Sequence, residues 1–182
     1  MANTKTLKPE ILTHPNIPKP LHGIAPRIVK GKVWWDIERR KCYEKAGQMC
    51  ECCGTPREHA WPNRWLEAHE TYEYKYGIFT FVGVVCLCPA CHKFIHSGLT
   101  QLLFERGELS LDTYERIRKH GHYILKQNGL TEKWKERHNY VCPEWKDFRM
   151  CIDGKYYGPS SRNLLSWKMG EWKKWEPKPN AR

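Results

Sequence analysis

The sequence predicts a small α+β protein whose core is a ββα unit stabilised by a metal ion. The first observation is two Cys-x-x-Cys pairs, at residues 50–53 and 88–91. The second is two runs rich in aromatic and β-branched residues, 65–74 and 78–87, which predict the strands of a hairpin. The third is a helix expected to begin at the second cysteine pair, where Pro89 suits the first helical position. Two strands and a helix therefore follow the first cysteine pair in that order.

The segment before this core is predicted to be an extended arm followed by a helix. The arm contains five prolines, which disfavour a helix: Pro9, Pro15, Pro18, Pro20 and Pro26. Residues 33–47 are predicted to be helical, because Trp35, Cys42 and Ala46 share one helical face and Gly47 can end the helix.

The two cysteine pairs predict a structural zinc site. Zinc prefers four tetrahedral ligands, and each Cys-x-x-Cys turn supplies two thiolates. The predicted ligands are Cys50, Cys53, Cys88 and Cys91. Cys52 competes for the first turn, and the alternative interpretation is that the cysteines are buried thiols or disulfides. No signal peptide is recognised at the N-terminus, so nine cysteines favour metal binding in a reducing compartment.

Histidines around the hairpin and the following helix form a second group. His92 and His96 are four residues apart, so they share one face of the predicted helix, with Cβ atoms about 5 to 6 Å apart. His69 lies on the first predicted strand, where alternation places Glu67 on the same face and Glu70 on the other. This spacing suits a second metal.

Helices are also predicted at residues 100–106 and 110–127, separated from the preceding helix by a break at residues 97–98. Asp153-Gly154 predicts the turn of a C-terminal hairpin within residues 145–157. His120 and His122 are predicted to lie on the surface. The chain is accordingly divided into three parts: a basic, proline-rich arm (1–32), a zinc-binding core with flanking helices (33–130), and a C-terminal hairpin with a basic, tryptophan-rich extension (131–182).

The net charge of +11 is concentrated at the ends of the chain. Residues 1–32 carry six basic side chains and one acidic, and residues 155–182 carry seven and two, whereas the middle is almost balanced. Basic ends can follow a phosphate backbone, although they can also serve only as solubilising tails. No apolar run reaches the roughly 20 residues of a membrane span, so we expect no membrane association.

The order of Cys-x-x-Cys-Gly, Glu-Ala-His-Glu at residues 67–70, and Cys-x-x-Cys-His-x-x-x-His at residues 88–96 resembles the HNH, or ββα-metal, endonuclease family in its zinc-supported form. The resemblance covers about a quarter of the chain and implies an HNH-like fold for the core. It also implies a phage or mobile-element setting, in which such proteins act as homing or nicking enzymes.

The sequence departs from the family pattern at two positions. Ala68 precedes His69, where the family has a metal ligand, and Gly83 stands where it has an asparagine. Two assignments follow from the resemblance. Either His69 is the general base and Glu67 or Glu70 completes the metal site, or His69 joins His92 and His96 as a ligand and Glu70 is the base.

These observations predict a metal-dependent endonuclease that hydrolyses DNA phosphodiester bonds. The expected catalytic residues are His69, Glu70, His92 and His96, with a catalytic Mg²⁺, Mn²⁺ or Zn²⁺ beside the structural zinc. DNA is the expected partner, and the cytoplasm of a bacterial host is the expected location. The alternative is a catalytically degraded module of the same fold that binds nucleic acid or a host or defence protein.

Overall fold

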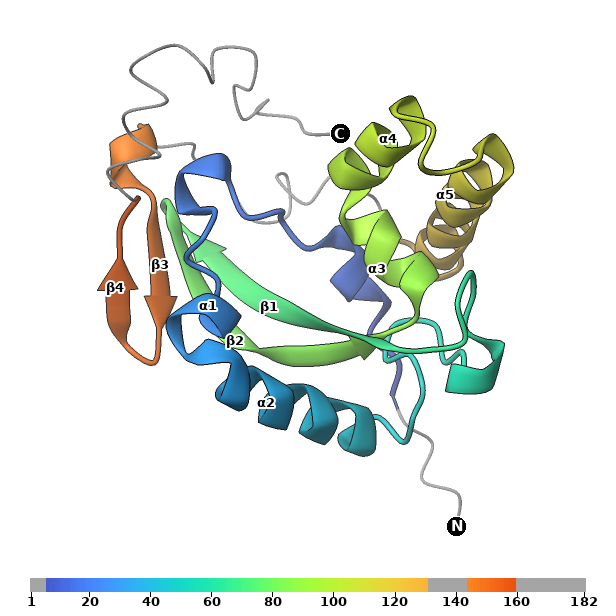
Figure 1. The fold of residues 1–182 in the computed structure, drawn as a ribbon, viewed down its shortest axis with the longest axis horizontal. Helices are drawn as coiled ribbons and strands as arrows, with labels where there is room; N and C mark the ends of the chain where they lie inside the picture. The colour runs from blue at the N-terminus through green and yellow to red at the C-terminus, as the bar shows by residue number, and fades with distance from the viewer. Residues whose placement is uncertain (1–5, 131–143, 160–182) are drawn as a thin grey trace. The chain divides into compact units, whose positions relative to one another are not determined.

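The structure is a computed structural model, and it describes residues 6–130 and 144–159. It has a mixed α+β architecture with a four-stranded sheet in the order β1-β2-β3-β4 (Figure 1). The strands are β1 (Glu67–Lys75), β2 (Ile78–Leu87), β3 (Arg149–Ile152) and β4 (Lys155–Tyr157). The predicted α+β class is therefore confirmed.

The chain divides into two compact units that alternate along the sequence. Among the described residues, the first unit takes 6–14, 37–69 and 84–130, and the second takes 15–36, 70–83 and 144–159. The predicted boundaries at residues 32 and 130 stay predictions, because most of the third predicted part lies outside the described residues.

Both predicted hairpins are present. Tyr76 and Gly77 connect β1 to β2 with φ angles of 48° and 84°, and Asp153 and Gly154 connect β3 to β4 with 50° and 76°. Two consecutive positive φ angles define the type I′ turn, whose twist matches that of paired strands. The parallel pairing of β3 with β2, which aligns Phe79 with Met150, was not predicted from sequence.

The helix that follows the second cysteine pair is also present. In α3 (Pro89–Ile95), Cys88 is the N-cap and Pro89 the first residue, as predicted. The break after it lies at His96, so the predicted break at residues 97–98 is wrong. Ser97 already begins α4 (Ser97–Glu105), because the Thr100 N–H bonds to the His96 carbonyl at 2.9 Å.

The longest helix, α5 (Leu111–Gln127), begins as predicted, with the Ser110 hydroxyl accepting from the Thr113 N–H. Its buried residues are Ile117, Gly121, Ile124 and Leu125, whereas Leu111 and Tyr123 are 57% and 63% exposed. Gly121 lies against the ring of Phe94 in α3.

The N-terminal segment is not wholly extended, contrary to prediction. It contains η1 (Pro9–Thr13), η2 (Lys19–Leu21) and α1 (Pro26–Val29), each with a proline at its first or second position. The predicted helix that follows is α2 (Gly31–Lys45). Short 3-10 turns also occur at η3 (Arg57–His59) and η4 (Trp145–Asp147).

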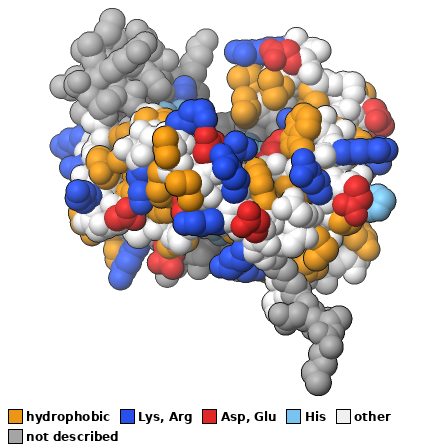
Figure 2. Space-filling view, turned by 60° about the horizontal axis from the view of Figure 1, so that its bottom comes forward, with side chains coloured by type: hydrophobic (Ala, Val, Ile, Leu, Met, Phe, Trp, Pro, Cys, Tyr) orange, Lys and Arg blue, Asp and Glu red, His pale blue; other side chains and the backbone are white. Residues whose placement is uncertain are grey.

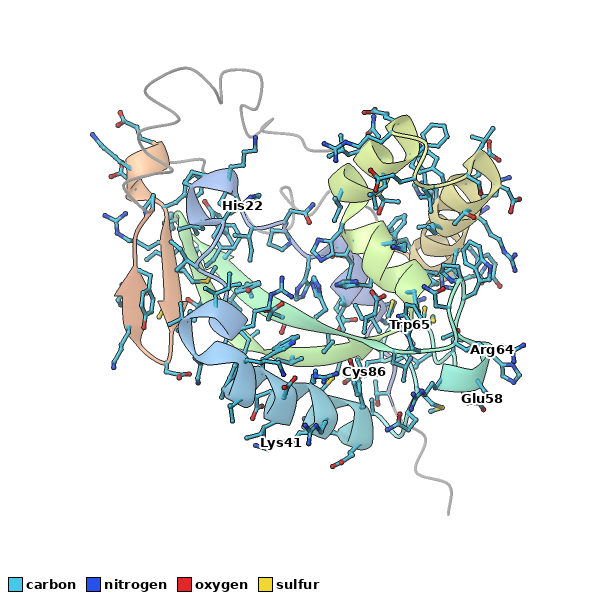
Figure 3. The ribbon with its side chains drawn as sticks, in the orientation of Figure 1. His22, Lys41, Glu58, Arg64, Trp65 and Cys86 are labelled. Carbon is cyan, nitrogen blue, oxygen red and sulfur yellow. The ribbon has the colours of Figure 1, made fainter. Side chains whose placement is uncertain are left out.

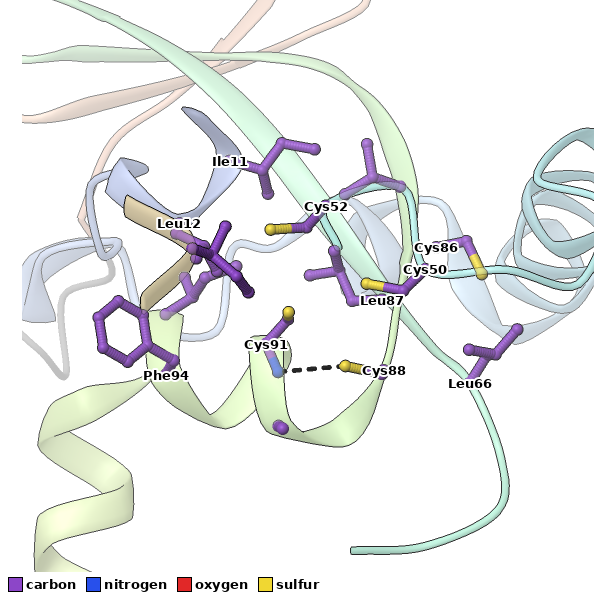
Figure 4. Close-up of a cluster of buried hydrophobic side chains, with 14 of the residues drawn as sticks. Ile11, Leu12, Cys50, Cys52, Leu66, Cys86, Leu87, Cys88, Cys91 and Phe94 are labelled. Carbon is purple, nitrogen blue, oxygen red and sulfur yellow. Dashed lines mark hydrogen bonds between the residues drawn. The ribbon is translucent and has the colours of Figure 1, made fainter. Parts of the chain in front are cut away.

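Each unit has its own buried cluster. The cluster of the first unit contains Ile11, Leu12 and the cysteine pairs (Figure 4). That of the second contains mainly aromatic and aliphatic side chains of the sheet and Leu21: Tyr72, Tyr74, Phe79, Phe148, Met150 and Ile152. Tyr76 does not belong to this cluster, because it lies in the turn between β1 and β2 and is 72% exposed.

Four described cysteines outside the predicted zinc site are buried free thiols: Cys42, Cys52, Cys86 and Cys151. Cys142 and the tryptophan-rich extension at 160–182 lie outside the described residues. Within the part of the chain that the structure describes, no helix has the length and apolar character needed to cross a membrane.

Candidate metal centres

The first unit brings the four predicted zinc ligands together. The sulfur atoms of Cys50, Cys53, Cys88 and Cys91 all lie within 4.8 Å of one another. The sulfurs of Cys53 and Cys88 are 3.8 Å apart. Zinc–sulfur bonds of about 2.3 Å in a tetrahedron separate the sulfurs by about 3.8 Å. The donor set and its spacing therefore fit a structural zinc ion.

Local backbone bonds shape the two cysteine turns. Gly54, with a φ of 74°, donates its N–H to the Cys50 carbonyl at 2.9 Å. In the second turn, the Cys91 N–H points at the Cys88 sulfur at 3.5 Å (Figure 4). An N–H group directed at a thiolate stabilises its negative charge.

Glu51 ties the first turn to the end of β2. Its N–H donates to the Cys86 carbonyl at 2.7 Å, and its carboxylate accepts from the Cys86 N–H at 2.8 Å. Lys8 donates to the other carboxylate oxygen at 3.1 Å. The cysteine pairs are thus held close by a buried carboxylate whose role sequence reasoning missed.

The thiols shift one another's pKa in opposite directions. A hydrogen bond with Cys50 lowers the pKa of Cys53, and another with Cys50 raises the pKa of Cys88. Four thiolates at this separation repel one another, so a cation between them is needed to keep all four ionised. A divalent ion that binds thiolates meets this requirement.

His120 contacts this cluster, contrary to its predicted surface position. Its Nε2 lies 3.5 Å from the Cys91 sulfur. The sequence separation of 29 residues leaves no local signal for this contact. His122, by contrast, is exposed as predicted, with its ring 5.4 Å from that of Phe94.

The three predicted histidines also come together in the first unit. One ring nitrogen from each of His69, His92 and His96 lies within 4.8 Å of the other two. The ring centroids are 4.7 to 5.2 Å apart. His69 comes from β1, whereas His92 and His96 come from one face of α3 and its C-cap. Three imidazole nitrogens are a suitable donor set for a divalent transition metal.

Glu67 orients one of these histidines. Its Oε2 contacts Nδ1 of His92, and its Oε1 accepts from the Trp65 indole at 3.0 Å. Trp65 lies on the segment leading into β1 (Figure 3). Burial raises the pKa of Glu67, but the bonds from His92 and Trp65 outweigh it, so the pKa is lowered. A carboxylate bonded to Nδ1 leaves Nε2 of His92 available to a metal.

Glu70 belongs to the second unit. It is buried, and its Oε1 lies 3.5 Å from the Arg27 guanidinium. Among the described residues, neither group of close metal-ligating atoms includes Glu70. The Gly83 carbonyl accepts from the Thr71 hydroxyl at 3.1 Å within the same unit.

Sequence reasoning missed Trp65, although a signal for it was present. Trp65 and Glu67 are two residues apart, and strand side chains at that spacing share a face. Cys52, which competed for the first turn in sequence, is 1% exposed and shares the apolar cluster with Ile11 and Leu12 (Figure 4).

No protein-family model, curated protein or solved structure gives a significant match to this chain.

Proposed function

We propose that this protein is a metal-dependent endonuclease of the HNH, or ββα-metal, type that hydrolyses DNA phosphodiester bonds. The observation that carries the proposal is the convergence of His69, His92 and His96, whose ligand nitrogens lie within 4.8 Å of one another. Such a group, beside a zinc-type cysteine cluster, is suited to phosphodiester chemistry because a divalent ion polarises the phosphate and stabilises its developing charge.

The order of the elements supports the resemblance on which the family assignment rests. A hairpin formed by β1 and β2 is followed directly by α3, and the histidines sit on the first strand and on this helix. Cys88 caps α3, so the cysteine cluster fixes the start of the helix that carries His92 and His96. In this proposal the zinc is structural, since four thiolates leave it no open position.

We assign the three histidines to the catalytic metal and Glu67 to the positioning of His92. What supports His69 as a ligand is that its ring nitrogen lies close to those of both other histidines. With His69 as a ligand, the resemblance leaves the role of general base to Glu70, which lies against Arg27 in the second unit. That assignment is tested by substitution.

The first test is cleavage of supercoiled and linear DNA with added Mg²⁺, Mn²⁺ or Zn²⁺. Wild type is compared with His69→Ala and Glu70→Gln after equal content of structural zinc has been verified. We expect metal-dependent cutting that both substitutions abolish or strongly reduce. If His69 is a ligand, its removal also weakens binding of the second metal; if it is the base, metal binding persists while turnover is lost.

A non-catalytic zinc module is the second candidate. It is favoured by Ala68 and Gly83, which lack the side chains that the family uses at these positions. A binding module needs the cysteine cluster but has no need of His69. Absence of cutting on a broad set of DNA and RNA substrates, with DNA binding equal in wild type and His69→Ala, would establish this alternative and overturn the nuclease.

A further inference from the structure

A second region of the first unit has the chemistry of an anion-binding site. A cavity of about 410 Å³ opens between the loop that carries η3, the start of α3 and one face of α5. Its cationic, imidazole and aromatic lining comes from His59, Trp61, Arg116, Lys119, His120 and Tyr123. Among the described residues that line the cavity, none is acidic.

Arg116 is held in a position that suits recognition of an oxyanion. Its guanidinium carbon lies 4.3 Å from the centroid of the Trp61 ring. When a guanidinium stacks on an indole, the flat face of the guanidinium contacts the ring. The N–H donors then point outward in the plane of the guanidinium. Because Trp61 is half-buried against the apolar cluster, the stack restrains Arg116 before any ligand binds. The N–H groups of Arg116 are therefore available to donate two hydrogen bonds to one phosphate.

Lys119 adds a second cation one helical turn along α5. Its ammonium contacts Glu115 at 3.0 Å, but both side chains are more than half exposed. Exposed ion pairs at i,i+4 contribute little stability, so Lys119 can turn towards an anion at small cost. Tyr123, four residues further along the helix, is 63% exposed and presents an aromatic ring at the same cavity.

We propose that this cavity binds a phosphate group together with its adjacent nucleobase. Arg116 and Lys119 bind the phosphate, and the ring of Tyr123 stacks on the base. The volume suits a ligand of nucleotide size. Cations interleaved with aromatic side chains are the usual means of binding a single-stranded nucleic acid without sequence preference.

The proposal deepens the proposed function, on which it rests for the choice of a nucleic acid strand as ligand. It adds a substrate-binding subsite that uses none of the three histidines. On the face drawn in Figure 2, Lys and Arg side chains are interspersed with Asp and Glu.

The test measures binding of a fluorescein-labelled single-stranded oligodeoxythymidine by anisotropy, with the full chain carrying His69→Ala so that no cleavage interferes. Arg116→Gln, Lys119→Gln and Tyr123→Ser are compared with Arg118→Gln and Lys126→Gln. The two controls change exposed cations of the same helix that do not line the cavity. All five side chains are exposed, and circular dichroism verifies that the variants fold.

We expect Tyr123→Ser to weaken binding about fivefold or more. Arg116→Gln should reduce the slope of log affinity against log salt by about 0.7, the value for one phosphate contact on a single strand. Arg118→Gln and Lys126→Gln should change the affinity and the salt slope much less. Ultraviolet cross-linking of an oligonucleotide with 5-iodouracil should attach to Trp61 or Tyr123, identified by mass spectrometry.

Equal loss of affinity in the cavity variants and the controls would overturn the proposal, as would cross-links confined to other segments. Competition by poly-glutamate as strong as that by the oligonucleotide would instead identify an acidic peptide as the ligand. If thymidine 5′-monophosphate competes as well as the strand, the phosphate-and-base chemistry stands but its source is a free nucleotide. Because binding is measured without cleavage, failure of the nuclease proposal leaves this result interpretable.

Discussion

At the scale of single residues, Glu67 connects strand β1 to helix α3, which carries His92. Its two carboxylate oxygens contact different partners, the Trp65 indole and Nδ1 of His92. Because Glu67 contacts Nδ1 of His92, the other ring nitrogen, Nε2, faces away from the carboxylate. In the proposed function, the affinity of the histidine group for a metal depends on Glu67, which need not touch the metal.

We expect Glu67→Gln to weaken binding of the second metal about 10- to 100-fold, the usual effect of removing a carboxylate behind a metal-binding histidine. Titration calorimetry with Mn²⁺ or Zn²⁺, on protein already loaded with structural zinc, measures this. Glu73→Gln is the matched control, because Glu73 is an exposed carboxylate on the same strand. Equal affinities in the two variants would contradict the positioning role.

Two neighbouring tyrosines of β1 make opposite contributions to stability. The Tyr74 hydroxyl accepts from the Gly77 N–H at 2.8 Å in the hairpin turn. The Tyr72 hydroxyl is buried and has no hydrogen-bond partner among the described residues. Burial raises the pKa of Tyr72, and the nearby Glu70 adds to the effect.

Tyr72→Phe should therefore increase the free energy of unfolding by about 1 kcal/mol, whereas Tyr74→Phe should lower it by a similar amount because it leaves a buried N–H unpaired. Urea denaturation of both variants measures the contrast. The folded pKa of Tyr72 exceeds its unfolded value of about 10. Above pH 10 the unfolded state therefore loses the tyrosine proton more readily than the folded state does, and the free energy of unfolding falls as the pH rises. Tyr72→Phe should weaken this alkaline loss of stability, and an unchanged pH profile would contradict the assignment.

At the scale of elements, the packing of α3 against α5 depends on a missing side chain. A Cβ atom added at Gly121 would lie 2.1 Å from Cδ2 of Phe94, with two more ring atoms within 2.4 Å. Only glycine allows the ring of Phe94 to approach the backbone of α5 this closely. This contact holds together the helix that carries His92 and the helix that lines the cavity.

Gly121→Ala should destabilise the protein by about 1 to 3 kcal/mol through overpacking, despite the better helix propensity of alanine. Gly98→Ala in α4 is the matched control, since nothing lies within 4 Å of its added Cβ. We expect that variant to be neutral or slightly stabilised. If chemical denaturation gave Gly121→Ala and Gly98→Ala the same free energy of unfolding, that result would contradict the close approach of Phe94 to Gly121.

At the scale of the whole molecule, the cysteine cluster joins segments distant in sequence within the first unit. It links the loop after α2 to the start of α3, and Glu51 and Lys8 add further ties to the N-terminal segment. Zinc binding by such a site supplies folding free energy on the order of 10 kcal/mol. The fold of this unit should therefore depend on its metal.

We expect a strong chelator, or Cys88→Ser, to remove zinc and abolish both the near-UV circular dichroism signal and the cooperative melt. Cys52→Ala is the control, because Cys52 is buried beside the cluster without belonging to it. Its zinc content should equal that of wild type. A zinc-free protein that still melted cooperatively would contradict the structural role of the cluster.

The sequence alone determined the features that depend on short-range spacing. Four features follow from residues close together in the chain or from the periodicity of a helix: the cysteine turns, the two hairpin turns, the start of α3 at Cys88 and the shared face of His92 and His96. The sulfur pairs within each cysteine turn were predictable for the same reason, because a Cys-x-x-Cys turn limits where its sulfurs can lie.

Only the tertiary structure decided the contacts between distant segments. It paired β3 with β2, brought His120 to Cys91, placed Arg27 against Glu70, and assembled the cavity from η3, α3 and α5. It also buried Ile11 and Leu12, which the prolines around them had suggested would be extended. These contacts depend on how elements pack, and packing is set by the shapes of surfaces that no local pattern records.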